Sequence, residues 1–171
     1  MEWLKKWLNR VFIDGLSGMA LGLFSTLIVG TIIQQVGTLI GGQVGEITYL
    51  AGKLAAAMTS AGIGVGVAYK FKEPPLVVLS AATAGMAGGF ASKILAGTVL
   101  VDGVVQLAGP GEPLGAFIAA YVAIEAGHLV SGKTKVDILV TPIVTIVAGC
   151  AVGLLVGPPI SRMMTSLGSL I

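Results

Sequence analysis

Charged residues divide the chain into long apolar stretches, and this spacing predicts membrane-spanning helices. A helix needs roughly 20 mostly apolar residues to cross the hydrocarbon core of a bilayer. Stretches of about that length lie near 12–33, 51–70, 74–95, 114–131 and 137–157. We expect the last helix to end at Gly157-Pro158-Pro159, because proline interrupts helices, which leaves 158–171 as a C-terminal segment. The sequence therefore predicts a single membrane domain, 1–171, with an all-α polytopic transmembrane bundle of about five spans.

Three further segments do not fit a simple crossing helix. Residues 1–11 are predicted to form an interfacial amphipathic helix, with Trp3 and Trp7 on one face and the lysines turned elsewhere. A cleaved signal peptide is the alternative, but the following apolar run is long and lacks a nearby small-residue cleavage site. The glycine-rich segments 34–50 and 96–113 are candidates for re-entrant or interfacial pieces, and the second is equally compatible with an external loop.

The distribution of lysine and arginine predicts the orientation in the membrane. If all five spans cross, one side carries seven cations and the other three. The seven are Lys5, Lys6, Arg10, Lys70, Lys72, Lys133 and Lys135, and the three are Lys53, Lys93 and Arg162. Because cytoplasmic loops carry the excess of positive charge, we expect a cytoplasmic N-terminus and an external C-terminus.

Composition supports a membrane protein and excludes several other classes. Only 11% of the residues are charged, against about 25% in ordinary soluble domains. A net charge of +2 gives no basic stripe of the kind that nucleic-acid binding requires. With one histidine and one cysteine, we expect no metal site, no cofactor and no hydrolytic triad, so the chain is not expected to be an enzyme. Cys150 lies in an apolar run and is interpreted as a small buried residue.

Many of the 26 glycines recur at intervals of four residues, which places them on one face of a helix. The repeats are Gly18 and Gly22, Gly62 and Gly66, Gly85 and Gly89, and Gly149, Gly153 and Gly157. Small residues at this spacing let helix backbones approach closely in a membrane. Glycines around Gly41 and Gly109 instead interrupt the apolar pattern, which marks where a polar pathway is expected.

Ionisable residues inside or beside spans are the candidate functional residues, because burying them in a membrane is costly. Glu125 and His128 are three residues apart on the fourth predicted helix, so both lie on one face and can bind a polyhydroxylated solute or each other. An interfacial, water-exposed His128 is the alternative. Glu112, in a Pro-Gly-Glu-Pro turn, either points into a substrate cavity or is an exposed loop acid. Lys93 and Asp102 are possible supporting residues of the substrate site. The alternative is that both simply lie at the membrane interface.

Several segments resemble a known membrane family. Residues 131–142, Ser-Gly-Lys-Thr-Lys-Val-Asp-Ile-Leu-Val-Thr-Pro, followed by Gly157-Pro158-Pro159, resemble the EIIC-like membrane proteins of the phosphotransferase system, including their PfoR-like regulators. Residues 14–22 and 112–117 are similar as well. The chain resembles the N-terminal half of such proteins, and a missing second half would give an inverted repeat.

This resemblance implies a function and partners. It implies a permease-like subunit in the bacterial cytoplasmic membrane, usually dimeric, that binds and translocates a polar carbohydrate. Any phosphoryl transfer would belong to a separate cytoplasmic phosphocarrier domain. A non-transporting membrane regulator is the alternative, and a small channel is a third reading. Glu125, His128 and Glu112 are then the expected sugar-binding residues.

Overall fold

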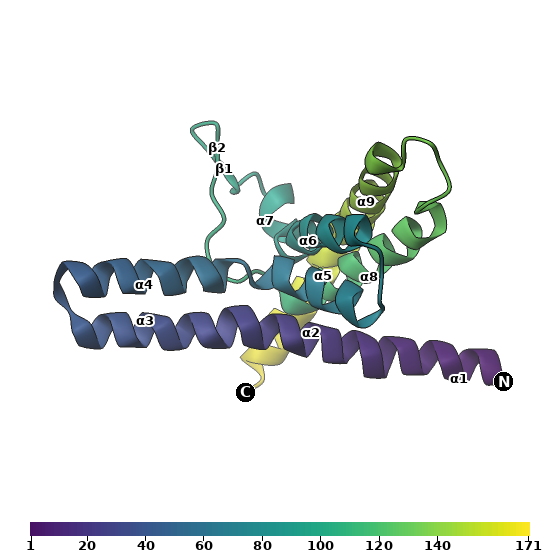
Figure 1. Ribbon diagram of the computed structural model, residues 1–171. Helices are drawn as coiled ribbons and strands as arrows, with labels where there is room; N and C mark the ends of the chain where they lie inside the picture. Colours follow the sequence, from purple (N-terminus) through teal and green to yellow (C-terminus); the bar gives the residue numbers. More distant parts are fainter.

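The computed structural model describes all 171 residues, and residues 2–40 form one long helix (Figure 1). The helix runs without a break from Glu2 to Ile40, through α1 (Glu2–Leu8), η1 (Asn9–Gly15), α2 (Leu16–Leu23), η2 (Phe24–Ile28) and α3 (Val29–Ile40). The two η segments are π-helical turns. Residues 1–11 are therefore not a helix separate from the first predicted span, because no capping residue or turn interrupts the apolar pattern that follows.

The glycine-rich segment 34–50 is the tip of a helical hairpin. Gly41, with a φ of 66°, reverses the chain, and α4 (Gly42–Ala57) returns alongside α3. A Cβ on Gly37 would lie 2.7 Å from the Gly45 carbonyl oxygen, and one on Gly30 would lie 2.7 Å from that of Gly52. The glycines near Gly41 therefore bring two helices together, and Figure 1 shows this α3–α4 arm extending away from the other helices.

A second glycine contact joins the long helix to α5 (Thr59–Lys70). The chain bends by 53° between α4 and α5. Gly18 and Gly22 of α2 pack on Gly66 and Gly62 of α5, and a Cβ on Gly18 would lie 2.6 Å from the Gly66 carbonyl oxygen. The predicted close approach of glycine-bearing helices is confirmed at these four positions.

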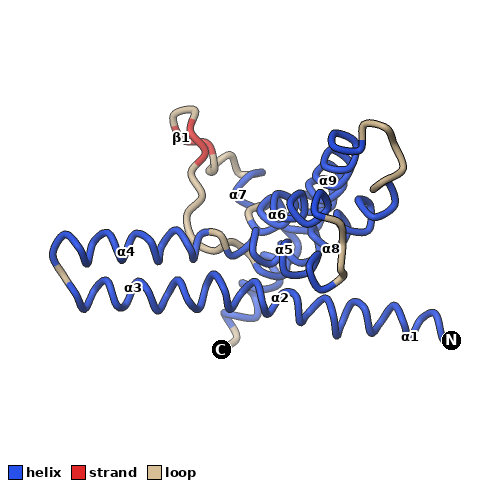
Figure 2. The backbone as a smooth tube through the Cα atoms, in the orientation of Figure 1, coloured by secondary structure: helices blue, strands red, loops and turns tan.

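The third predicted span, 74–95, is divided into two helices. α6 (Pro75–Gly89) ends at Phe90, and α7 (Ala91–Leu95) follows. Beyond α7 the chain forms an exposed two-stranded hairpin, β1 (Leu100–Val101) and β2 (Val104–Val105), as Figure 2 shows. Residues 96–112 thus form a β-hairpin and a loop, and α8 begins at the last residue of the predicted segment, Pro113.

The last two helices correct one expectation about proline. α8 (Pro113–Val130) is followed by α9 (Asp137–Ser169), which continues through Pro158 and Pro159. The predicted helix end at these prolines is wrong. Gly157 packs directly on Ala91, and Ile160 is buried, so contacts with the bundle hold the helix on both sides of the missing backbone donors.

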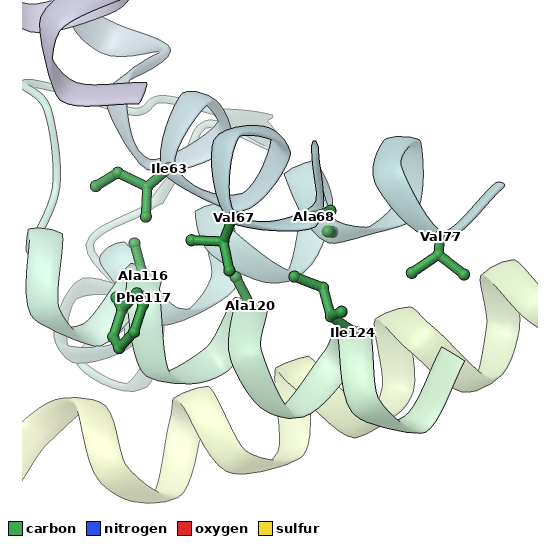
Figure 3. Close-up of a cluster of buried hydrophobic side chains, with 9 residues drawn as sticks. Ile63, Val67, Ala68, Val77, Ala116, Phe117, Ala120 and Ile124 are labelled. Atoms are coloured by element: carbon green, nitrogen blue, oxygen red, sulfur yellow. The ribbon is translucent and has the colours of Figure 1, made fainter. Parts of the chain in front are cut away.

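The core lies where α5, α6 and α8 meet, with α9 packed against α6 and α8 (Figure 3). Ile63 and Val67 of α5 face Ala120 and Ile124 of α8 in this cluster, and all four are fully buried. Outside the core, long helices expose large apolar side chains such as Phe12 and Leu155.

The predicted all-α fold is confirmed, since 81% of the residues are helical. Three helices are long and apolar enough to span a membrane, or four when the bent α4–α5 pair is counted as one span. The expected number was about five. One span is missing at α6, which has 15 residues because the chain breaks at Phe90, and the bend between α4 and α5 separates the counts of three and four.

Candidate functional site: two polar sites at opposite ends of α8

Four charged or ionisable side chains form a network at the C-terminal end of α8. Arg10 Nη2 lies 3.2 Å from Glu73 Oε1 and 3.0 Å from Glu125 Oε1, and His128 Nδ1 lies 2.8 Å from Glu73 Oε2. The network joins the N-terminal helix, the α5–α6 turn and α8. Glu125 and His128 therefore do not bond each other, and they are linked through Arg10 and Glu73.

Glu73 is the central acceptor of this network. Its side chain is only 2% exposed, and both of its carboxylate oxygens are engaged, one by Arg10 and one by His128. The side chains of Arg10, Glu125 and His128 are 35%, 41% and 59% exposed. A carboxylate that is this buried needs cationic or hydrogen-bonding partners, so the three elements are held together here.

Aromatic side chains cover one side of the network. The Arg10 guanidinium carbon lies 4.3 Å from the centroid of the Phe71 ring, and Phe71 meets Tyr121 edge-to-face with centroids 6.1 Å apart. Arg10 Nε and Glu125 Oε1 are buried without a hydrogen bond, so the Arg10–Glu125 contact is an ion pair without hydrogen-bond geometry. Sequence reasoning missed Glu73 as a site residue, although its place directly before two prolines signalled a carboxylate held in a rigid turn.

A cavity of about 400 Å³ lies at the other end of α8. Its wall includes Lys93 and Glu112, which are two of the residues that the sequence predicted. The remaining lining residues are mostly small or backbone-dominated: Gly88, Gly89, Phe90, Ser92, Ala108, Gly109, Pro110, Gly111, Gly157 and Ser161.

Breaks in secondary structure converge on this cavity. The α6–α7 break at Phe90 supplies part of its wall, and the loop before α8 supplies another part. Ser60, just after the α4–α5 bend, donates a 2.8 Å hydrogen bond to the Pro110 carbonyl. The Glu112 backbone N–H donates to the Gly89 carbonyl at 2.7 Å. These two bonds fix the loop against α5 and α6.

Lys93 and Glu112 present opposite charges to the cavity without pairing. Lys93 Nζ donates a 2.8 Å hydrogen bond to the Ala108 carbonyl and lies 5.4 Å from the Phe90 ring centroid. The Glu112 carboxylate makes no ion pair and no hydrogen bond within the protein. A carboxylate that accepts and an ammonium that donates suit a ligand rich in hydroxyls.

The predicted site residues thus fall into separate places. Glu112 precedes the first residue of α8, whereas Glu125 and His128 lie about 20 and 24 Å farther along its axis, at 1.5 Å per residue. One sugar ring cannot contact both ends. Asp102 lies at the tip of the exposed β-hairpin with a φ of 51°, and forms no ion pair with Lys93.

The single cysteine takes part in neither site. Cys150 lies in α9 and is partly exposed, so the expectation of a small buried residue is wrong. The neighbouring Gly149 and Gly153 are the residues that pack inward, against Ala123 of α8 and Gly88 of α6. Cys150 therefore lies beside the packed face of α9.

Comparison with known proteins gives one match. Residues 13–171 match the profile of a family described as "Phosphotransferase system, EIIC". No curated protein and no solved structure matches the chain. The match covers every helix described above except α1 and the start of η1.

Proposed function

Because the chain belongs to the EIIC family of the phosphotransferase system, a family of membrane transport components, we propose that it binds a polar carbohydrate in the cavity at the N-terminal end of α8. The observation that carries this proposal is the convergence of the α6–α7 break and the 108–112 loop around an unpaired Glu112. Interrupted helices form substrate sites in transporters because their free backbone groups are available to a ligand.

Glu112 and Lys93 are the proposed binding residues. The Glu112 carboxylate accepts hydrogen bonds from two sugar hydroxyls, and the Lys93 ammonium donates to a third hydroxyl or a ring oxygen. Gly88, Gly89 and Gly111 also line the cavity, and the absence of a side chain at each lets α5, α6, α8 and the 108–112 loop pack closely around it. The arrangement suits an uncharged polyhydroxylated solute, because the carboxylate and the ammonium offset each other's charge.

Glu125 and His128 have a different proposed role. They hold the N-terminal helix and the α5–α6 turn on α8 through Arg10 and Glu73. The sequence-based hypothesis of one site formed by Glu112, Glu125 and His128 is replaced here by a binding site at one end of α8 and a structural network at the other.

Transport requires the binding cavity to open alternately to each side of the membrane. We propose that one group of helices moves against another at the glycine faces, where helix backbones approach closely. We further propose that the protein lies in the bacterial cytoplasmic membrane with its N-terminus in the cytoplasm, and that two copies of the chain form a dimer. A separate cytoplasmic phosphocarrier domain phosphorylates the sugar.

A binding experiment tests the site directly. Sugars and polyols are titrated against the full chain in detergent, and affinities are compared for the wild type, Glu112→Gln and Lys93→Gln. Asp102→Asn is the matched control, because Asp102 is an exposed carboxylate of the same loop region outside the cavity. We expect Glu112→Gln to lose at least about tenfold in affinity, as removal of a charge-assisted hydrogen bond costs about 1.5–3 kcal/mol. Unchanged affinity in both cavity variants overturns the site.

Transport is tested in the same variants. Uptake of a bound sugar is measured in cells or vesicles that supply the phosphocarrier components. Binding with Glu112-dependent uptake supports the transporter. Binding without uptake contradicts transport and favours the regulatory role.

A further inference from the structure

A basic groove lies between the N-terminal helix and the end of α5. It has a volume of about 350 Å³ and is lined by Lys6, Asn9, Arg10, Asp14, Lys70, Phe71 and Lys72. Four of these residues come from the N-terminal helix and three from α5 and the turn after it. The groove is separate from the carbohydrate cavity, which shares none of these residues.

The groove has an excess of unpaired positive charge. Lys6, Lys70 and Lys72 form no ion pair, and Arg10 is engaged by Glu73 and Glu125. Asp14 is the one carboxylate in the lining. Glu73 adjoins Lys70 and Lys72 in a neighbouring depression, but both of its oxygens are taken by Arg10 and His128. Three ammonium groups facing one carboxylate favour an anionic ligand.

The backbone holds two of the lysines in a fixed turn. Lys72 has a φ of 57°, in the left-handed region that side-chain-bearing residues adopt rarely. The turn is fixed by hydrogen bonds from the Lys72 N–H to the Tyr69 carbonyl and from the Glu73 N–H to the Ala68 carbonyl, at 3.0 and 3.1 Å. A strained residue persists where the surroundings determine its conformation, which is a common property of ligand sites.

The surroundings of the groove point to a ligand at a membrane surface. Exposed apolar side chains of the N-terminal helix, including Leu8, Phe12 and Ile13, lie next to its lining residues in sequence. Trp7 and Tyr69 are also exposed there, and such aromatic side chains prefer the boundary between lipid tails and water. A ligand with a phosphate head and acyl chains would meet lysines at one end and apolar side chains at the other.

We propose that this groove binds the phosphate-bearing headgroup of an anionic membrane phospholipid. Lys70 and Lys72 bind the phosphate oxygens from the α5 side, and Lys6 binds them from the N-terminal helix. Asn9 donates its amide N–H to the same headgroup. Basic pockets between membrane helices bind anionic headgroups by this combination of charge and hydrogen bonding. The bound lipid then joins the N-terminal helix to α5 beside the network of Arg10 and Glu73.

The test compares lipid binding by matched charge variants of the full chain. Lys6→Gln, Lys70→Gln and Lys72→Gln are combined in one variant, and Lys5→Gln, Lys133→Gln and Lys135→Gln in another. Both variants lose three exposed cations, and the control residues lie outside the groove. Lipid adducts are counted by native mass spectrometry, and the thermal midpoint is measured in detergent with added dioleoylphosphatidylglycerol, dioleoylphosphatidylcholine or inorganic phosphate.

We expect phosphatidylglycerol to give more adducts and a larger rise in midpoint than phosphatidylcholine in the wild type and the control variant. Both effects are lost in the groove variant. Equal loss in the two variants overturns the groove as the site, because total charge then explains binding. An equal rise with inorganic phosphate overturns the lipid and indicates a soluble phosphate ligand. No preference for phosphatidylglycerol in the wild type also overturns the proposal.

Discussion

Arg10 and Glu73 form an ion pair at 3.2 Å although 63 positions separate them in the chain. The contact joins the N-terminal helix to the turn between α5 and α6, and it places a cation beside a carboxylate that is almost fully buried. Since Glu125 also meets Arg10, one guanidinium serves two acids from different elements.

Arg10→Gln is expected to destabilise the protein. The substitution leaves the buried Glu73 carboxylate with His128 as its remaining partner. Loss of a partly exposed cationic partner such as Arg10 costs about 1–3 kcal/mol in the free energy of unfolding. The measurement is the thermal midpoint in detergent, with Lys5→Gln as the control, because Lys5 is exposed and unpaired. The double variant Arg10→Gln/Glu73→Gln should lose less than the sum of the two single variants. An additive result would contradict coupling through this pair.

His128→Ala should have a smaller effect than Arg10→Gln. It removes the 2.8 Å contact with Glu73, but the His128 side chain is 59% exposed, so water replaces part of the lost hydrogen bond. We expect a loss of about 0.5–1.5 kcal/mol in the free energy of unfolding, measured by denaturant titration in mixed micelles. A loss larger than that of Arg10→Gln would show that the imidazole, not the guanidinium, is the main partner of Glu73.

Gly18→Ala tests the contact between the long helix and α5. The added Cβ would lie 2.6 Å from the Gly66 carbonyl oxygen, which the backbone can accommodate only by moving the two helices apart. Overpacking of this kind costs about 1–3 kcal/mol. Gly168→Ala is the matched control, because nothing lies within 4 Å of a Cβ at that position. Equal thermal midpoints for the two variants would contradict the close approach of α2 and α5.

Ser60→Ala tests the anchoring of the loop that lines the proposed carbohydrate-binding cavity. It removes the hydrogen bond to the Pro110 carbonyl from a fully buried hydroxyl. We expect a loss of about 1 kcal/mol in stability and a weaker sugar affinity, since the loop carries Glu112. Ser25→Ala is the control, because the Ser25 hydroxyl bonds only a carbonyl of its own helix. An unchanged sugar affinity in Ser60→Ala would contradict a role of this hydrogen bond in sugar binding.

The predicted orientation is tested by cysteine labelling. In a Cys150→Ser background, single cysteines replace Asp102 in the β-hairpin and Lys133 in the α8–α9 loop. An impermeant maleimide added to intact cells should label position 102 and leave position 133 unlabelled, because the predicted orientation places the second position on the cytoplasmic, lysine-rich side. Labelling of position 133 alone would reverse the predicted orientation.

The sequence predicted local features better than long-range ones. The apolar stretches and the four-residue glycine spacing are visible along the chain, and Gly18, Gly22, Gly62 and Gly66 do pack together. The bond between Glu73 and His128 was not predictable, because a pattern along the chain contains no information on which elements become neighbours. Glu112 and Glu125 were expected to bind the same sugar, and the length of α8 is what separates them.

The prediction of a helix end at Gly157-Pro158-Pro159 was wrong for a related reason. Propensity predicts a helix end at Pro158, yet contacts of Gly157 and Ile160 with the bundle outweigh the missing hydrogen bonds. Tertiary packing decides such cases, and it is not readable from the local sequence. At Gly41, in contrast, the local sequence was informative. It indicated an interruption of the apolar pattern, and the structure has a chain reversal between α3 and α4 at this residue.

The long N-terminal helix has a consequence for how the protein meets its bilayer. A helix from Glu2 to Ile40 has 39 residues and is about 58 Å long, whereas the hydrocarbon layer is about 30 Å thick. Even at a tilt of about 40° the layer covers only about 39 Å of its length. About a third of the helix therefore extends into headgroups or water, so the tip near Gly41, the end bearing Lys5 and Lys6, or both project beyond the membrane core.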